Sequence, residues 1–111
     1  MAMKLVSEKT RTVNLNDYTF HYIEKGNGTP IVFVHGSIDD LRSWENQMGA
    51  FKDKFRVISY SRRFHYPNSP SSTSAYSVEQ HSKDLENFIA KLDLAPVNLV
   101  AHYMAPKFAW M

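Results

Sequence analysis

Three histidines stand at places where catalytic side chains are often found. His35, His65 and His102 each lie at or shortly after the end of a run of apolar residues. Three neutral imidazoles plus a water form a catalytic zinc site, in which the metal lowers the pKa of the bound water to about 7. Convergence of the three rings would therefore give a divalent metal site, with zinc as the expected ion. The alternative is that each histidine only packs or makes loop hydrogen bonds.

Two adjacent arginines add positive charge to the same region. Arg62 and Arg63 could hold an anionic or phosphoryl oxygen, although such a pair more often supports a loop through backbone carbonyls. Backbone N–H groups near Gly36 and Ser37 could stabilise the same developing anion. The hydroxyl of Ser37 has no identifiable base, so we do not expect it to be a nucleophile. The predicted catalytic residues are Arg62, Arg63, Gly36 and Ser37.

Five segments have the pattern of β-strands. Residues 9–15 and 18–25 alternate β-branched or aromatic residues with polar ones around Asn16-Asp17, which predicts an antiparallel hairpin. Residues 31–34 are a continuous apolar run, which is typical of a strand buried on both faces of a parallel sheet, and residues 55–60 and 97–100 are predicted to be two further buried strands.

Two segments between these strands have helical periodicity. The apolar positions are Leu41, Trp44, Met48 and Phe51 in the first segment, and Val78, His81, Leu85, Phe88, Ile89 and Leu92 in the second. Asp39 or Asp40 is expected to cap the first helix, and either is also a candidate fourth metal ligand. Ser77 and Gln80 form a capping box for the second. Residues 61–76 between them read as a long loop rich in serine and proline.

The order of these elements predicts an α/β fold with an N-terminal antiparallel hairpin and three parallel strands joined by helical crossovers. Parallel strands connected through helices form right-handed units, and the hairpin adds an antiparallel edge. Ligands of open α/β sheets bind at the carboxyl ends of the strands. Neighbouring strands lie about 4.8 Å apart, so His35, His65 and His102 could reach one ion.

Composition limits the other function classes. With 111 residues, 43% of them apolar, the chain is expected to form one domain over residues 1–111. A net charge of +2 is too small to indicate nucleic acid or a membrane surface as a partner. The sequence has no cysteine and no long apolar run, so we expect a cytoplasmic protein without disulfides.

Four separated motifs resemble the N-terminal part of the α/β-hydrolase fold superfamily, in family order. They are P-I-V-F-V-H-G-S, the R-S-W of the first helix, S-Y-S-R-R-F-H-Y-P-N and V-N-L-V-A-H, and together they span most of residues 10–105. The resemblance implies the strand order 1-2-4-3-5. It also implies an oxyanion hole built from the backbone after His35, at Gly36, Ser37 and their neighbours.

The same resemblance exposes departures from the family pattern. The family's nucleophile elbow reads G-x-S-x-G, and residues 101–105 read A-H-Y-M-A, which puts Tyr103 in place of the serine. The family's acid and histidine follow the elbow, where this sequence has no matching residues. A phenol with a reference pKa of about 10 is a poor substitute nucleophile. We hypothesise that a single-base deletion within the codon of Tyr103 truncated a longer hydrolase, which sequencing of the encoding DNA would test.

Truncation at that point would leave residues 97–101 as an edge strand. A long apolar edge invites pairing with another chain, so we expect a homodimer through residues 97–101, or through an exchange of the tail 108–111.

Three functions follow from these features. The first is a metal-dependent hydrolase of small activated esters or phosphoesters, similar to a phosphotriesterase, in which a metal-bound hydroxide replaces the lost triad. The second is a non-catalytic hydrolase remnant that only self-associates. The third is a module that binds hydrophobic ligands.

Overall fold

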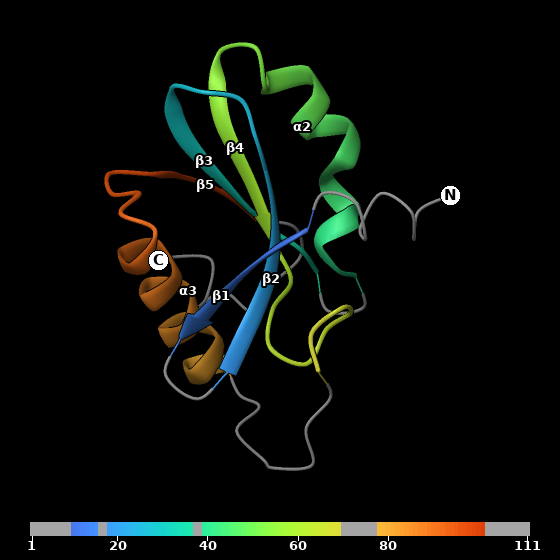
Figure 1. The fold of residues 1–111 in the computed structure, drawn as a ribbon, viewed down its shortest axis with the longest axis vertical. Coiled ribbons are helices and arrows are strands. Elements are labelled where there is room, and N and C mark those ends of the chain that lie inside the picture. Colours follow the sequence, from blue (N-terminus) through green and yellow to red (C-terminus); the bar gives the residue numbers. More distant parts are fainter. Residues whose placement is uncertain (1–9, 16–17, 37–38, 70–77, 102–111) are drawn as a thin grey trace.

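The computed structural model describes residues 10–15, 18–36, 39–69 and 78–101. In chain order the elements are β1 (Arg11–Leu15), β2 (Tyr18–Lys25), β3 (Thr29–Val34), the 3-10 helix η1 (Leu41–Trp44), α2 (Glu45–Phe51), β4 (Phe55–Tyr60), α3 (Val78–Lys91) and β5 (Asn98–Ala101) (Figure 1). Among the helices in these ranges, none has the length and apolar character needed to cross a bilayer.

The strands form one mixed sheet in the order β1-β2-β4-β3-β5. β1 and β2 form the expected antiparallel hairpin, and β2 pairs antiparallel with β4. β3 lies parallel to both β4 and β5. The sequence-based prediction of fold class and strand order is therefore confirmed.

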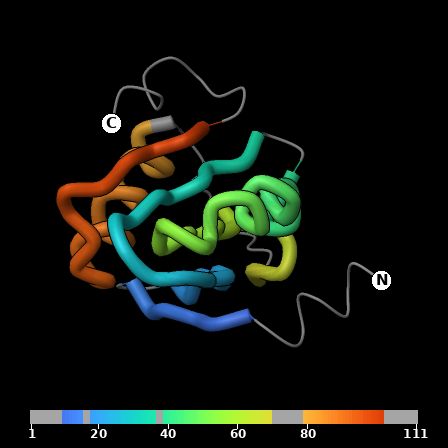
Figure 2. The backbone as a smooth tube through the Cα atoms, turned by 90° about the horizontal axis from the view of Figure 1, so that it is seen from above, coloured from blue at the N-terminus to red at the C-terminus, as the bar shows by residue number. Residues whose placement is uncertain are grey.

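Helices cover both faces of the sheet, so the core has two parts (Figure 2). Side chains alternate between faces along each strand. Val32 and Val34 of β3 pack toward α3 with Leu85 and Phe88, in the larger hydrophobic cluster. Ile31 and Phe33 of the same strand belong to the cluster that contains Leu41 of η1 and Met48 of α2.

The first predicted helix forms as two pieces. A 3-10 turn over Leu41–Trp44 runs directly into α2, and the side chain of Asp40 caps it by accepting a hydrogen bond from the N–H of Arg42 at 2.9 Å. Asp40 is therefore the cap, while Asp39 acts through its backbone. The proposed Ser77 cap of α3 lies outside the described residues.

β5 is the edge strand that the sequence analysis expected, and it is not buried on both faces. It occupies one end of the strand order, and 37% of Val100 is exposed. The apolar run indicated a strand correctly, but burial depends on which neighbours cover it. Pairing of a second copy along this strand stays a prediction, and the tail expected to take part lies outside the described residues.

Candidate functional site

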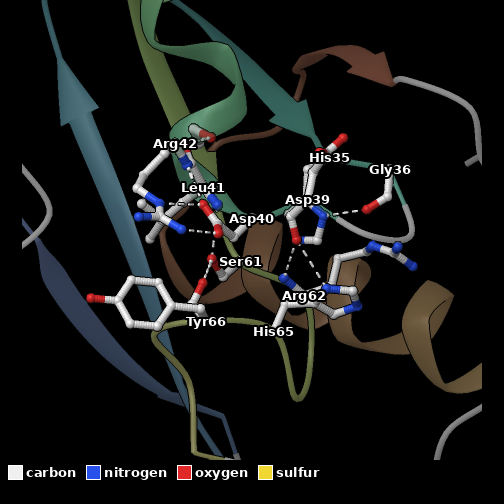
Figure 3. Close-up of polar contacts among 11 residues, drawn as sticks. His35, Gly36, Asp39, Asp40, Leu41, Arg42, Ser61, Arg62, His65 and Tyr66 are labelled. Atoms are coloured by element: carbon white, nitrogen blue, oxygen red, sulfur yellow. Dashed lines mark hydrogen bonds and ion pairs between the residues drawn. The ribbon is translucent and has the colours of Figure 1, made fainter. Parts of the chain in front are cut away.

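The carboxyl ends of β3 and β4 meet at one edge of the sheet. Val34 of β3 is in register with Tyr60 of β4 and with Ala101 of β5. The loops that follow β3 and β4 therefore leave the sheet side by side, and they carry His35 and most of the other predicted site residues (Figure 3). His102 follows β5 and falls outside the described part of the chain, so its convergence with the others stays a prediction.

His35 is fully buried, and the backbone engages both of its ring nitrogens. The N–H of Arg62 donates to Nε2 at 2.9 Å, so Nε2 is unprotonated, and Nδ1–H donates to the carbonyl oxygen of Gly36 at 2.7 Å. Burial, aided by the charge of Arg62, lowers the pKa of His35 to about 3. His35 is thus a neutral imidazole in a fixed tautomer, with both ring nitrogens committed to the backbone.

His65 and His81 continue a row of imidazoles from His35. The ring centroids of His35 and His65 are 4.6 Å apart, and those of His65 and His81 are 6.5 Å apart. Nδ1–H of His65 donates to the carbonyl oxygen of Asp39 at 3.0 Å. Burial, followed by the charge of Arg62, lowers the pKa of His65, and the same two causes lower that of His81 to about 4. The row is therefore neutral at neutral pH.

This row is not a metal centre. Within the ranges that the structure describes, no group of three or more His, Cys, Asp or Glu side chains is arranged to hold a metal ion. The ring lone pair of His35 accepts from a backbone N–H instead. Asp40 directs its carboxylate to Arg42, with Oδ1 2.8 Å from Nε, and so serves as cap and ion-pair partner rather than as a fourth ligand.

The two predicted catalytic arginines have different surroundings. Arg63 makes a bidentate ion pair with Asp84 of α3, with Nε 2.9 Å from Oδ2 and a terminal nitrogen 3.0 Å from Oδ1. Only 9% and 4% of the two side chains are exposed. The guanidinium of Arg63 also lies 4.7 Å from the ring centroid of Tyr18. Arg63 therefore ties the loop after β4 to α3 and β2, which is a structural role.

Arg62 lies at the centre of the histidine row. It is buried, and its positive charge contributes to the lowered pKa values of His35, His65 and His81. Its backbone N–H holds His35, so Arg62 links the loop after β4 to the loop after β3. A catalytic role for its guanidinium stays a prediction.

Asn68 holds the loop after β4 in shape and was not identified from the sequence. Its Oδ1 accepts from the backbone N–H and from Nδ1 of His21, both at 2.8 Å. Its Nδ2 donates to the carbonyl oxygens of Ser61 at 2.8 Å and Arg62 at 3.0 Å. The sequence placed Asn68 in the long loop of residues 61–76, but nothing in it indicated a partner 47 positions away.

Asp84 is the second residue that sequence analysis missed, and here a signal existed. It lies between His81 and Leu85, which are two positions of the apolar stripe of α3. A carboxylate at a stripe position is rarely buried without a partner. That pattern predicts a buried cation, and Arg63 supplies it.

The turn after His35 carries the predicted oxyanion donors. The carbonyl oxygen of Gly36 accepts from the His35 ring and from the N–H of Asp39, the latter at 3.2 Å. Ser37 lies outside the described residues. A shallow cavity of about 380 Å³ beside this turn is lined by Asp39, Ser43, Trp44 and Gln47.

Comparison with known proteins gives consistent matches. The model of the alpha/beta hydrolase fold family matches residues 29–105. A non-heme chloroperoxidase of Kitasatospora aureofaciens is 36% identical over 84 residues, which cover 75% of this chain and 30% of that protein. Epoxide hydrolase 2 of Caenorhabditis elegans is 32% identical over 101 residues, covering 88% of this chain and 28% of the relative.

Solved structures agree with the sequence matches. The crystal structure of an epoxide hydrolase from Vigna radiata superposes with a TM-score of 0.84 at 28% identity, covering 92% of this chain and 34% of that one. The chain thus spans about a third of the length of the relatives it matches.

These relatives overturn the prediction of a metal-dependent esterase or phosphotriesterase. They are epoxide hydrolases and chloroperoxidases described as non-heme, of a superfamily that typically uses a Ser, His and Asp mechanism, and nothing among them indicates metal dependence. The prediction relied on the positions of His35, His65 and His102 near the carboxyl ends of parallel strands, from which we expected the three rings to converge on one ion. Burial and backbone hydrogen bonds at His35 instead favour a structural imidazole. The alternative of a non-catalytic remnant that only self-associates stays a prediction.

The strand order of the structure is the one that the family resemblance implied, and the family model matches more than half of the sequence. The chain belongs to the α/β-hydrolase fold family.

Proposed function

We propose that this chain forms the oxyanion-stabilising part of a hydrolase that acts on small carboxylic esters. The relatives include proteins named as epoxide hydrolases, so hydrolysis is the reaction class that they support. The contribution of residues 35–41 is to hold backbone N–H groups toward the oxygen that becomes negative during attack on the substrate.

The anchoring of the Gly36 carbonyl by His35 carries this proposal. A hydrogen bond to the carbonyl oxygen of Gly36 restricts rotation of the backbone at Gly36, where the turn begins. The anchor is a buried, neutral ring with two backbone hydrogen bonds at 2.7 and 2.9 Å. Donors fixed in advance stabilise a developing charge without reorganisation during the reaction.

Arg62 supports the same role through its charge. Its charge lowers the pKa values of three histidines, so Arg62 contributes positive charge near the carboxyl end of β4. A positive potential beside the oxyanion favours the transition state over the neutral ester. In this proposal Arg62 assists electrostatically, while the backbone supplies the hydrogen bonds.

Hydrolysis of 4-nitrophenyl acetate by the purified chain tests the proposal. We expect Ser37→Pro, which removes one backbone N–H, to lower the rate above buffer by about 100-fold, the usual cost of losing one oxyanion donor. Ser37→Ala, which keeps the N–H, is the matched control and should retain the rate. A chelator should have no effect. Equal rates in both variants would indicate nonspecific hydrolysis by exposed imidazoles and would contradict the proposal.

A further inference from the structure

Two buried serines, Ser59 of β4 and Ser61 directly after β4, hydrogen-bond both backbone polar groups of Leu41, the residue at which the loop after β3 enters η1. The N–H of Leu41 donates to Oγ of Ser61 at 2.9 Å, and its carbonyl oxygen accepts from Oγ of Ser59 at 2.8 Å. The hydroxyl of Ser61 in turn donates to the carbonyl oxygen of Tyr66 at 2.6 Å (Figure 3). Each hydroxyl is therefore oriented by its own donated hydrogen bond.

Hydroxyl groups at these two positions need an explanation, because the positions belong to the core. Val57, Ser59 and Ser61 alternate along β4 and so share one face of the strand. Val57 packs in the cluster that contains Leu41, and neither serine has any exposed surface. Burial of a hydroxyl in such a place is unfavourable unless it is hydrogen-bonded. An apolar residue would fill the space but would remove these two hydrogen bonds to the backbone of Leu41.

His35 holds one end of the loop after β3, and the two serines hold the other end. The backbone N–H of Arg62 holds the ring of His35, which holds Gly36 at the start of the turn. Ser59 and Ser61 hold Leu41 at its other end. Three positions at the carboxyl end of β4 thus fix the loop after β3 on both sides of the residues proposed to carry the oxyanion donors.

We propose that Ser59 and Ser61 are positioning residues, which set the geometry of the loop after β3 by holding Leu41. This inference rests on the proposed function for its chemical meaning, because the loop's catalytic value depends on oxyanion stabilisation. Neither serine is a nucleophile. The hydroxyl of each is committed as a donor to a backbone carbonyl, and both are fully buried.

Amide hydrogen exchange of the whole chain tests the positioning role directly. We expect Ser59→Ala and Ser61→Ala each to speed exchange of the amides of residues 36–41 by about 10-fold relative to those of α3, since each removes a buried partner of Leu41. The double variant should fall short of the product of the two single effects, because both act through one residue. Ser82→Ala, on α3, is the matched control and should leave the loop amides unchanged.

Ester hydrolysis supplies a second readout that a merely structural role would not change. Ser59→Ala, which removes one hydrogen bond rather than two, should lower kcat several-fold with KM unchanged, because the loop's donors act on the transition state. An increase in exchange that is uniform over α3 and the loop would overturn the positioning role. So would multiplicative effects in the double variant. Absence of hydrolysis by the parent chain would instead overturn the proposed function, and the exchange result would still decide the role of the serines.

Discussion

The two loops at the carboxyl edge of the sheet are held by different physical means. The loop after β4 is tied down by a buried ion pair, Arg63 with Asp84, and by the amide of Asn68. The loop after β3 is tied down by neutral groups, which are the ring of His35 and the hydroxyls of two serines. Neutral anchors fix a loop without placing a fixed charge beside its backbone donors. The buried ion pair of Arg63 with Asp84 lies where the loop after β4 faces α3.

Of the changes considered, acidification should affect the neutral anchors most strongly. The folded pKa values of His35, His65 and His81 lie below the ordinary value of 6.5, so the unfolded chain binds more protons below pH 6.5 and stability falls as pH falls. The pKa values of about 3 and about 4 for His35 and His81 place the loss between about pH 6 and 4. Urea unfolding over this range should show it.

The variant His81→Gln measures how much one histidine contributes to the loss of stability at low pH. His81 faces Arg62, Arg63, Asp84 and His65, and His81→Gln removes its titration. We expect a shallower dependence of unfolding free energy on pH in the variant. Stability that stays constant from pH 7 to 4.5 in the parent chain would contradict the neutral-anchor interpretation. The carboxyl of Asp40, whose pKa is lowered, contributes at still lower pH, since its stabilisation is lost only as pH falls below about 4.

Removal of one partner of the buried ion pair should give the largest effect among single substitutions. Asp84→Ala leaves Arg63 as a buried charge and should lower the unfolding free energy by about 3–5 kcal/mol. Replacing both partners, as Arg63→Met with Asp84→Leu, should recover much of this loss because no uncompensated charge remains. Chemical denaturation measures both. A cost below 1 kcal/mol for Asp84→Ala would show that the pair does not hold the loop.

Removal of the neutral anchor should cost somewhat less. His35→Ala deprives the N–H of Arg62 and the carbonyl of Gly36 of a partner and opens a cavity, for about 3 kcal/mol. The loss at His35 should be independent of salt concentration, in contrast to an effect based on charge. A salt-dependent loss would contradict the distinction between the two loops.

The exposed ion pair of the loop after β3 should matter least. Arg42 and Asp40 have the same bidentate geometry as the buried pair, but 31% and 14% of their side chains are exposed. Arg42→Ala should therefore cost about 0.5 kcal/mol, and less in high salt. Denaturation at two ionic strengths checks this. A cost comparable with that of Asp84→Ala would mean that geometry, not burial, determines the strength of these pairs.

Sequence analysis predicted the elements well because their patterns are local. Apolar runs marked β3 and β4, alternation marked the hairpin, and helical spacing marked α2 and α3. It left open whether Asp39 or Asp40 caps η1, because both have the right side chain and only the backbone geometry selects Asp40. It placed His35 correctly at the end of β3, but it could not assign the direction of the ring.

The contacts that fix the site join residues far apart in the chain. Asn68 meets His21 across 47 positions, Arg62 meets His35 across 27, and Leu41 meets Ser59 and Ser61 across 18 and 20. No periodicity encodes such pairs. Each serine alone is an ordinary polar residue in a strand pattern, and only the crossing of η1 over β4 gives it a partner.

The sequence by itself therefore determined the secondary structure and the family pattern, since these depend on side-chain type and local spacing, and the resemblance to that family implied the order of strands. Tertiary structure alone decided that His35 is a neutral anchor and that Arg63 belongs to an ion pair. It also decided that two serines hold Leu41. The physical reason is that burial and hydrogen-bond partners, which set the charge and tautomer of a side chain, arise only when distant segments pack together.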